Sequence, residues 1–111
     1  MIFSIYRIDR VQAAGGRDAH RAAHLAYLKG FESAILCAGA LWSSDDEACD
    51  AGAPGAQPRE IGSLYLTEFD TQAQAEAFAS NDPFNVAGLF ERVEVRRFQA
   101  RMGTKKDAFT R

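Results

Sequence analysis

Two residues of the chain have side chains suited to proton transfer: a histidine in a predicted helix and an aspartate before a proline. Because a helix turns by about 100° per residue, His24 shares one face with Leu28 and Phe31 and should point into the protein. A titratable ring on a buried face needs a polar partner to offset its desolvation. If the fold brings the Asp-Pro-Phe step that begins at Asp82 next to His24, the two residues form an acid/base dyad.

A dyad of this kind would perform general acid/base chemistry. A carboxylate bonded to one ring nitrogen fixes the tautomer of the imidazole and favours its protonated form, and the other nitrogen can then exchange a proton with a bound molecule. The sequence contains no nucleophile elbow, phosphate-binding glycine loop or metal-ligand set that would indicate a different chemistry. The pattern therefore favours abstraction or delivery of a proton.

Each residue of the dyad also has a purely structural explanation. A single histidine on an apolar helix face is more often a hydrogen-bonded core residue than a catalyst, and Asp82 before Pro83 is fully explained as a helix cap. His20 and His24 have the spacing of two metal ligands, but no glutamate follows His20 and no third ligand is evident, so we expect no metal site. The acidic run at residues 45–47 lacks the ligand pattern of a calcium loop.

The composition is that of an ordinary globular domain. The 111 residues are 47% hydrophobic and 25% charged, and the formal net charge of -2 gives no reason to expect nucleic acid or an anionic membrane as a partner. Apolar runs stay well below the roughly 20 residues of a membrane helix, and the first residues resemble a strand instead of a signal peptide, so we expect a cytoplasmic protein. Cys37 and Cys49 stand alone, which indicates neither disulfides nor a zinc site.

Apolar alternation and turn residues predict six elements in the order β-α-β-β-α-β. The expected strands cover residues 2–9, 35–42, 62–69 and 90–98, and the expected helices cover residues 19–33 and a short alanine-rich segment after Thr71. Asp18 should cap the first helix, and Gly39 should mark a kink in the second strand. Thr71 and Gln74 form a capping box for the second helix, and Asp82 caps one further turn.

This order of elements is that of a ferredoxin-like α+β sandwich, in which a four-stranded antiparallel sheet carries the helices on one face. The domain should cover residues 1–100, with a long acidic loop at 43–60, and residues 101–111 should form a polar tail. Alternation in the first and third strands also places apolar residues on the opposite face of the sheet, where the helices cannot cover them. We therefore expect a homodimer through the sheet face.

The chain resembles the YCII-related family of dimeric α+β barrel proteins. The resemblance is carried by RAAHLAYLKGFESAILCAGAL, GSLYLTEF and NDPFNVAGLFERVEVRRF. Its most specific parts are the His-Leu step at His24 with Arg21 before it, and the Asp-Pro-Phe step at Asp82 followed by Ala-Gly-Leu. The chain departs from the family at Ala40, where members commonly have proline, and in the acidic insertion at 45–60, which we expect to reshape the pocket mouth.

The resemblance implies a ferredoxin-like protomer, a homodimer, and an active site built from His24 and Asp82. The family and its barrel relatives include isomerases and dehydrohalogenases that act on small ring compounds by proton transfer, so it also implies a small-molecule ligand and no bound cofactor. Two other functions stay open: a dimeric module that binds a metabolite without converting it, and a barrel-type monooxygenase.

Four further residues are candidates for binding the substrate. Tyr6, Trp42 and Phe84 are aromatic residues that would line an apolar pocket, and Arg21 lies one helical turn before His24, where it would hold an anionic group.

Overall fold

The computed structural model describes residues 1–11, 16–45 and 59–110. Its elements, in chain order, are β1 (Ile2–Asp9), α1 (Gly16–Lys29), β2 (Ile35–Trp42), β3 (Glu60–Glu68), α2 (Gln72–Asn81), α3 (Pro83–Val86), β4 (Phe90–Phe98) and the 3₁₀ helix η3 (Lys106–Phe109). The strands form one sheet in the order β2-β3-β1-β4, and every neighbouring pair is antiparallel. The predicted ferredoxin-like α+β sandwich is therefore confirmed.

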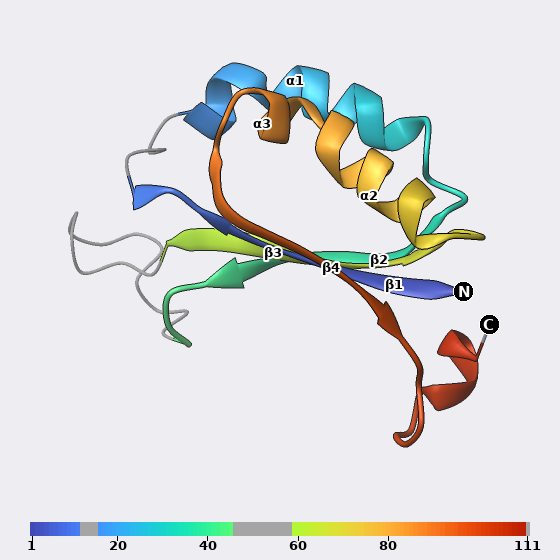
Figure 1. Cartoon of the computed structure of the whole chain (residues 1–111). Coiled ribbons are helices and arrows are strands. Elements are labelled where there is room, and N and C mark those ends of the chain that lie inside the picture. The colour runs from blue at the N-terminus through green and yellow to red at the C-terminus, as the bar shows by residue number, and fades with distance from the viewer. Residues whose placement is uncertain (12–15, 46–58, 111) are drawn as a thin grey trace.

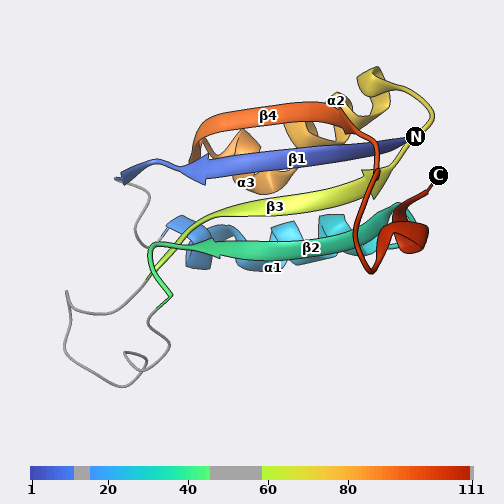
Figure 2. The ribbon, with the colours of Figure 1, turned by 90° about the horizontal axis from the view of Figure 1, so that it is seen from below.

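All three α-helices lie on the same face of the sheet (Figure 1). Seen from the opposite side, the four strands lie in front of the helices, and α1 runs behind β2 (Figure 2). β1 is central, because its Ile5 pairs with Tyr65 of β3 on one side and with Val95 of β4 on the other. Side chains of β1 and β3 that point to the helices therefore reach the middle of the molecule.

The two short helices begin as the sequence predicts. The Thr71 hydroxyl accepts a hydrogen bond from Gln74 N at 3.2 Å, and Gln74 Oε1 accepts one from Thr71 N at 3.3 Å, so the predicted capping box of α2 is confirmed. Asp82 is the N-cap of α3, with proline at the first helical position. This single helical turn, α3, connects α2 to β4.

The first helix differs from its prediction at both ends. It begins at Gly16 and ends at Lys29, so Asp18 lies within the first turn and does not cap it. Beyond Lys29 the chain forms tighter turns, in which Gly30 N donates to Tyr27 O and Phe31 N donates to Leu28 O. These bonds span three residues instead of four and end the α-helix before the predicted residue 33.

Two predictions on the second and third strands are also corrected. The register of β2 shifts between Ile35 and Cys37 and between Leu41 and Trp42, so the irregularities lie at its ends and Gly39 keeps regular pairing with Leu64. β3 begins at Glu60, before the predicted residue 62, because Glu60 still pairs with Trp42 of β2. Cys49 and most of the predicted acidic loop lie outside the described residues.

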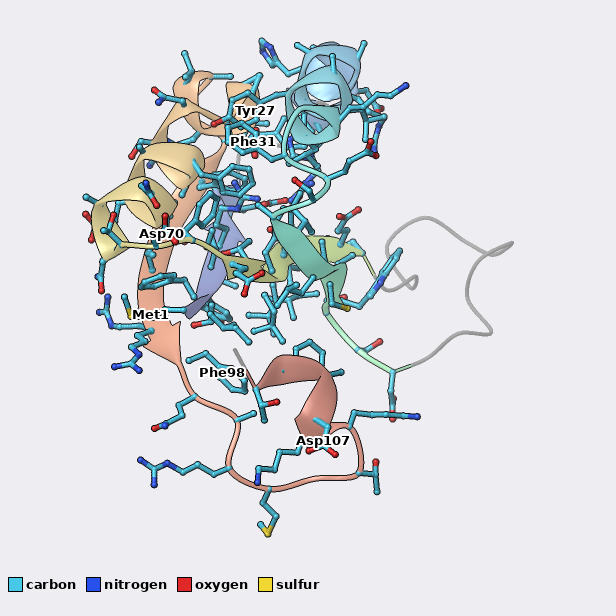
Figure 3. All side chains as sticks on the ribbon, turned by 90° about the vertical axis from the view of Figure 1, so that its right-hand side faces the viewer. Met1, Tyr27, Phe31, Asp70, Phe98 and Asp107 are labelled. Atoms are coloured by element: carbon cyan, nitrogen blue, oxygen red, sulfur yellow. The ribbon has the colours of Figure 1, made fainter. Side chains whose placement is uncertain are left out.

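Aromatic rings join the helices to the sheet. Tyr27 of α1 and Phe31 of the turn that follows it point into the layer between α1, α2 and the strands (Figure 3). The ring of Phe78 from α2 lies 4.8 Å from that of Phe31 and 5.7 Å from that of Tyr27, measured between centroids. Phe3 and Ile5 of β1 close this core from below. The core fixes the positions of α1 and α2 relative to β1.

The face of the sheet away from the helices carries both apolar and charged side chains. By alternation with the buried Ile5 and Tyr65, this face includes Tyr6 and Leu64, and Leu64 is 41% exposed. The segment after β4 with η3 lies on the same side (Figure 1), and Phe98 points toward it (Figure 3). Within the described part of the chain, no helix has the length and apolar character needed to cross a membrane.

Candidate active site

Asp82 occupies the junction between α2 and α3 and is completely buried. Its Oδ1 accepts a hydrogen bond of 2.9 Å from Phe84 N, which is the cap that starts α3. This hydrogen bond to the backbone fixes the position of the Asp82 carboxylate. The local Asp-Pro-Phe sequence therefore orients an acidic side chain toward the interior.

His24 of α1 meets this carboxylate. His24 Nδ1 lies 2.7 Å from Asp82 Oδ1, and the His24 side chain is 9% exposed. An ionised carboxylate only accepts hydrogen bonds, so we assign the proton of this contact to Nδ1. Nε2 is then the ring nitrogen available for proton exchange.

Arg7 of β1 holds the other oxygen of Asp82. Its Nη1 donates to Asp82 Oδ2 at 2.8 Å, and its Nε donates to the Ser63 hydroxyl of β3 at 3.3 Å. The guanidinium is buried between two rings, with its central carbon 4.6 Å from the centroid of Tyr65 and 4.9 Å from that of Phe90. A buried charge is tolerated here because ion pairing, hydrogen bonds and ring faces replace water.

The surroundings of Asp82 keep it ionised. Burial alone would raise the pKa of this carboxyl, but the hydrogen bond from His24, the charge of Arg7 and a backbone N–H outweigh it, so the pKa lies below its ordinary value of 3.8. Asp82 is therefore an anion that accepts hydrogen bonds at neutral pH. It orients the imidazole and balances its charge when the ring is protonated.

Phe84 and Arg17 form a stack over the imidazole. The rings of Phe84 and His24 are nearly parallel, at 14°, with centroids 3.9 Å apart. The guanidinium carbon of Arg17 lies 5.1 Å from the centroid of Phe84. Arg17 itself is held by Asp9, which accepts from its Nε at 2.7 Å and from its Nη2 at 2.8 Å. These contacts hold His24 in one orientation.

A cavity of about 190 Å³ opens beside this cluster. Its wall combines polar and apolar residues from β1, α1, β2, β3, α3 and β4, namely Arg7, Arg17, Arg21, His24, Leu25, Leu28, Ala38, Gly39, Ala40, Glu60, Ser63, Tyr65, Phe84 and Phe90. A concave site with a few convergent polar groups is typical of small-molecule binding. Within residues 1–11, 16–45 and 59–110, no group of three or more His, Cys, Asp or Glu side chains is arranged to hold a metal ion.

The structure brings some of the predicted site residues together and separates others. His24 and Asp82 are in contact, and Phe84 and Arg21 line the cavity. Tyr6 does not line the cavity, because it pairs in register with Leu64 on the face of the sheet away from the helices. Trp42 does not line it either; it ends β2 and is 55% exposed.

Several neighbours of His24 and Asp82 were not predicted from the sequence, among them Arg7, Arg17 and Tyr65. A signal for Arg7 was present, because it follows Phe3 and Ile5 at every second position of β1 and so shares their inward face. An arginine among inward positions needs a buried anion, and Asp82 is that anion. Arg17 and Tyr65 carried no comparable signal, since each depends on which elements become neighbours in space.

The fold and the cavity together define a small ferredoxin-like α+β protein with a site for a small molecule. The chain belongs to the family described as the YCII-related domain, which it matches over residues 1–99. The family predicted from the sequence is therefore confirmed. Protein YciI of Escherichia coli O6:H1 and Protein YciI of Shigella flexneri are each 35% identical to it over 101 residues, which cover 89% of this chain and 97% of theirs.

A solved structure of an enzyme is also similar. It is 5-chloro-2-hydroxyhydroquinone dehydrochlorinase (TftG) from Burkholderia phenoliruptrix AC1100, in complex with 2,5-dihydroxybenzoquinone. The TM-score is 0.72 and the identity 33%, over 88% of this chain and 93% of the dehydrochlorinase chain. The similar protein thus acts on a small hydroxylated ring.

Proposed function

We propose that this protein is an enzyme that moves protons on a small hydroxylated ring compound, with His24 as general acid/base. The observation that supports this most directly is the 2.7 Å contact between His24 Nδ1 and the buried, ionised Asp82. It leaves Nε2 as the exchanging nitrogen and places a counter-charge beside the imidazolium. Asp82 is the positioning residue of this pair.

The reaction class we propose is elimination of hydrogen halide or a related isomerisation. Loss of HCl from a chlorinated hydroquinone takes two stages. In the first, a ring hydroxyl loses a proton and the carbon that carries chlorine gains one. In the second, another hydroxyl loses its proton and chloride leaves with its bonding electron pair. A base that takes a proton and returns it serves both stages. The dehydrochlorinase activity named for the similar TftG structure supports this choice.

The cavity wall suggests how such a ring is held. Apolar contact to a ring is available from Phe84, Leu25 and Leu28. Arg21 also lines the cavity, and its guanidinium is only weakly paired with the exposed Asp18, at 3.4 Å. A hydroxylated quinone or hydroquinone loses protons readily and would place an anionic oxygen near Arg21. We therefore propose Arg21 and Phe84 as substrate-binding residues.

We also propose that two copies of the chain form a homodimer through the sheet faces that lack helices. The described residues leave Leu64 at 41% and Phe98 at 37% exposure on this face. Apolar strand positions are stabilised when a second apolar surface covers them. Arg92 and Glu94, which pair at 2.7 Å on β4, would lie toward the edge of such an interface.

The proposed activity is tested by chloride release from 5-chloro-2-hydroxyhydroquinone. We expect turnover by the natural chain and a loss of kcat of about 100-fold or more in His24→Gln. His20→Gln is the matched control, because His20 is an exposed histidine on the same helix. Equal turnover by the His24→Gln variant and the natural chain would refute the role of His24. Binding of 2,5-dihydroxybenzoquinone without any turnover would favour the non-catalytic binding module instead.

A further inference from the structure

Tyr65 of β3 reaches the second nitrogen of the imidazole. Tyr65 Oη lies 3.4 Å from His24 Nε2, on the side of the ring opposite the contact with Asp82. The tyrosine is 5% exposed, and it lines the same cavity as His24. The dyad is thus the inner part of a chain of three side chains that ends at a phenol hydroxyl.

The direction of the hydrogen bonds in this chain follows from Asp82. Because the ionised carboxylate requires a donor at His24 Nδ1, the neutral imidazole has its lone pair at Nε2. The group facing that lone pair must donate, so Tyr65 O–H points its proton at Nε2. Burial is the main cause that raises the pKa of Tyr65, and the opposing charge of Arg7 is smaller, so the phenol keeps this proton at neutral pH.

The position of the phenol ring is fixed by its neighbours. The guanidinium carbon of Arg7 lies 4.6 Å from the ring centroid, and Phe78 lies 6.4 Å away on the core side. The backbone of Tyr65 is paired with Ile5 of β1 and Ala38 of β2, so β3 is held on both sides. A ring so constrained keeps its hydroxyl at one place in the cavity wall.

We propose that Tyr65 is a second catalytic residue, which carries the proton between a hydroxyl of the bound ring and His24 Nε2. This inference rests on the proposed function, since it adds a step to the same site. The distance of 3.4 Å is long for a hydrogen bond and leaves room for shortening when a ligand packs against the phenol, as catalytic hydrogen bonds commonly do.

The proton balance of the step is simple. The substrate hydroxyl gives its proton to Tyr65 Oη while the Tyr65 proton passes to His24 Nε2, which leaves an anionic substrate oxygen, a neutral tyrosine and an imidazolium beside Asp82. In the reverse direction the imidazolium returns a proton through Tyr65 to the ring. The phenol is neutral before and after each transfer, which suits a group whose ionised form is disfavoured by burial.

The test is Tyr65→Phe, which keeps the ring over Arg7 and removes only the hydroxyl. We expect kcat for 5-chloro-2-hydroxyhydroquinone to fall by about 100-fold while KM changes much less, because the proposed binding residues Arg21 and Phe84 are unchanged. The matched control is Tyr27→Phe. The Tyr27 hydroxyl donates to the Phe78 carbonyl at 2.9 Å, outside the cavity wall, so its loss should leave kcat unchanged. The ¹⁵N signal of His24 Nε2 gives a second measurement, which should shift in Tyr65→Phe alone.

The outcomes separate this inference from the function on which it rests. If the natural chain turns over and His24→Gln does not, but Tyr65→Phe keeps kcat within threefold, the relay is refuted and the proposed function stands. If the natural chain releases no chloride, both are refuted. A fall in kcat equal in Tyr65→Phe and Tyr27→Phe would mean that the tyrosines act through stability, which also overturns the relay.

Discussion

Arg7 Nη1 donates to Asp82 Oδ2 at 2.8 Å, and the two side chains are 1% and 0% exposed. The other oxygen of Asp82 is shared by His24 and a backbone N–H, so the carboxylate has partners on both sides. Two charges buried in this way are stable only as a pair, because each alone would keep the cost of its desolvation. The pair joins β1 to the start of α3.

Replacing Arg7 by methionine should therefore destabilise the protein strongly. Methionine fills much of the space but leaves a buried carboxylate without its cation, and the free energy of unfolding should fall by about 3–5 kcal/mol. Urea denaturation followed by far-UV circular dichroism measures this change. The matched control is Arg92→Met, because Arg92 pairs with Glu94 at the surface, where such pairs contribute about 1 kcal/mol or less. Equal losses in the two variants would contradict the assigned role of the Arg7–Asp82 pair.

Stability should also depend on pH through Asp82. The pKa of Asp82 is lowered in the folded protein, against a cost of burial, by the His24 hydrogen bond and the charge of Arg7, whereas the unfolded chain has the ordinary value of 3.8. A lowered folded pKa contributes stability that is complete above pH 3.8 and is lost as the pH falls through the folded pKa. We expect the difference in unfolding free energy between the natural chain and Asp82→Asn to shrink over this acidic range.

The measurement for this prediction is urea denaturation of both proteins from pH 6 downward in steps of about half a unit. Asp70→Asn gives the control, because Asp70 is an exposed aspartate two residues after the end of β3. A difference between the natural chain and Asp82→Asn that stays constant with pH would show that Asp82 does not titrate with folding.

The contact between His24 and Asp82 could be predicted because both residues obey local rules. Helical periodicity turns His24 inward, and an aspartate before proline caps a helix whatever surrounds it. Arg7 obeys a local rule too, since strand alternation puts it beside Phe3 and Ile5, but that rule does not say which anion it meets. Only the three-dimensional fold, which brings the start of α3 next to β1, identifies Asp82 as the partner of Arg7.

The sequence did not predict which tyrosine lies at the cavity. Tyr6 and Tyr65 both lie in apolar strands, and one was predicted to bind substrate while the other was not. The register of β1 against β3 pairs Tyr6 with Leu64 and Ile5 with Tyr65, so the two tyrosines point to opposite faces. A shift of a single residue would pair Tyr6 with Tyr65 and place both rings on one face, and apolar residues on both faces of these strands leave that shift unspecified.

Phe84 should contribute to the stability of the site through its contact with His24. The two rings stack at 3.9 Å and 14°, and leucine would keep apolar contact but lose the parallel ring face. We expect Phe84→Leu to lower the free energy of unfolding by about 1 kcal/mol and to weaken binding of 2,5-dihydroxybenzoquinone, as measured by thermal unfolding and by calorimetric titration. Phe98→Leu is the control, since Phe98 lies 37% exposed on the other face. Unchanged binding by Phe84→Leu would exclude Phe84 from the ligand contacts.

The proposed homodimer makes a prediction that depends on which face is changed. Leu64 is 41% exposed on the side of the sheet without helices, and Val86 is 74% exposed on α3 on the opposite side. A glutamate at Leu64 would place a charge where the second copy is expected to pack, and burying an unpaired charge costs several kcal/mol. Light scattering at micromolar concentration should give a dimeric mass for the natural chain and for Val86→Glu, and a monomeric mass for Leu64→Glu. If the natural chain has a monomeric mass, the sheet face is not a dimer interface and the apolar strand positions must be stable in contact with water.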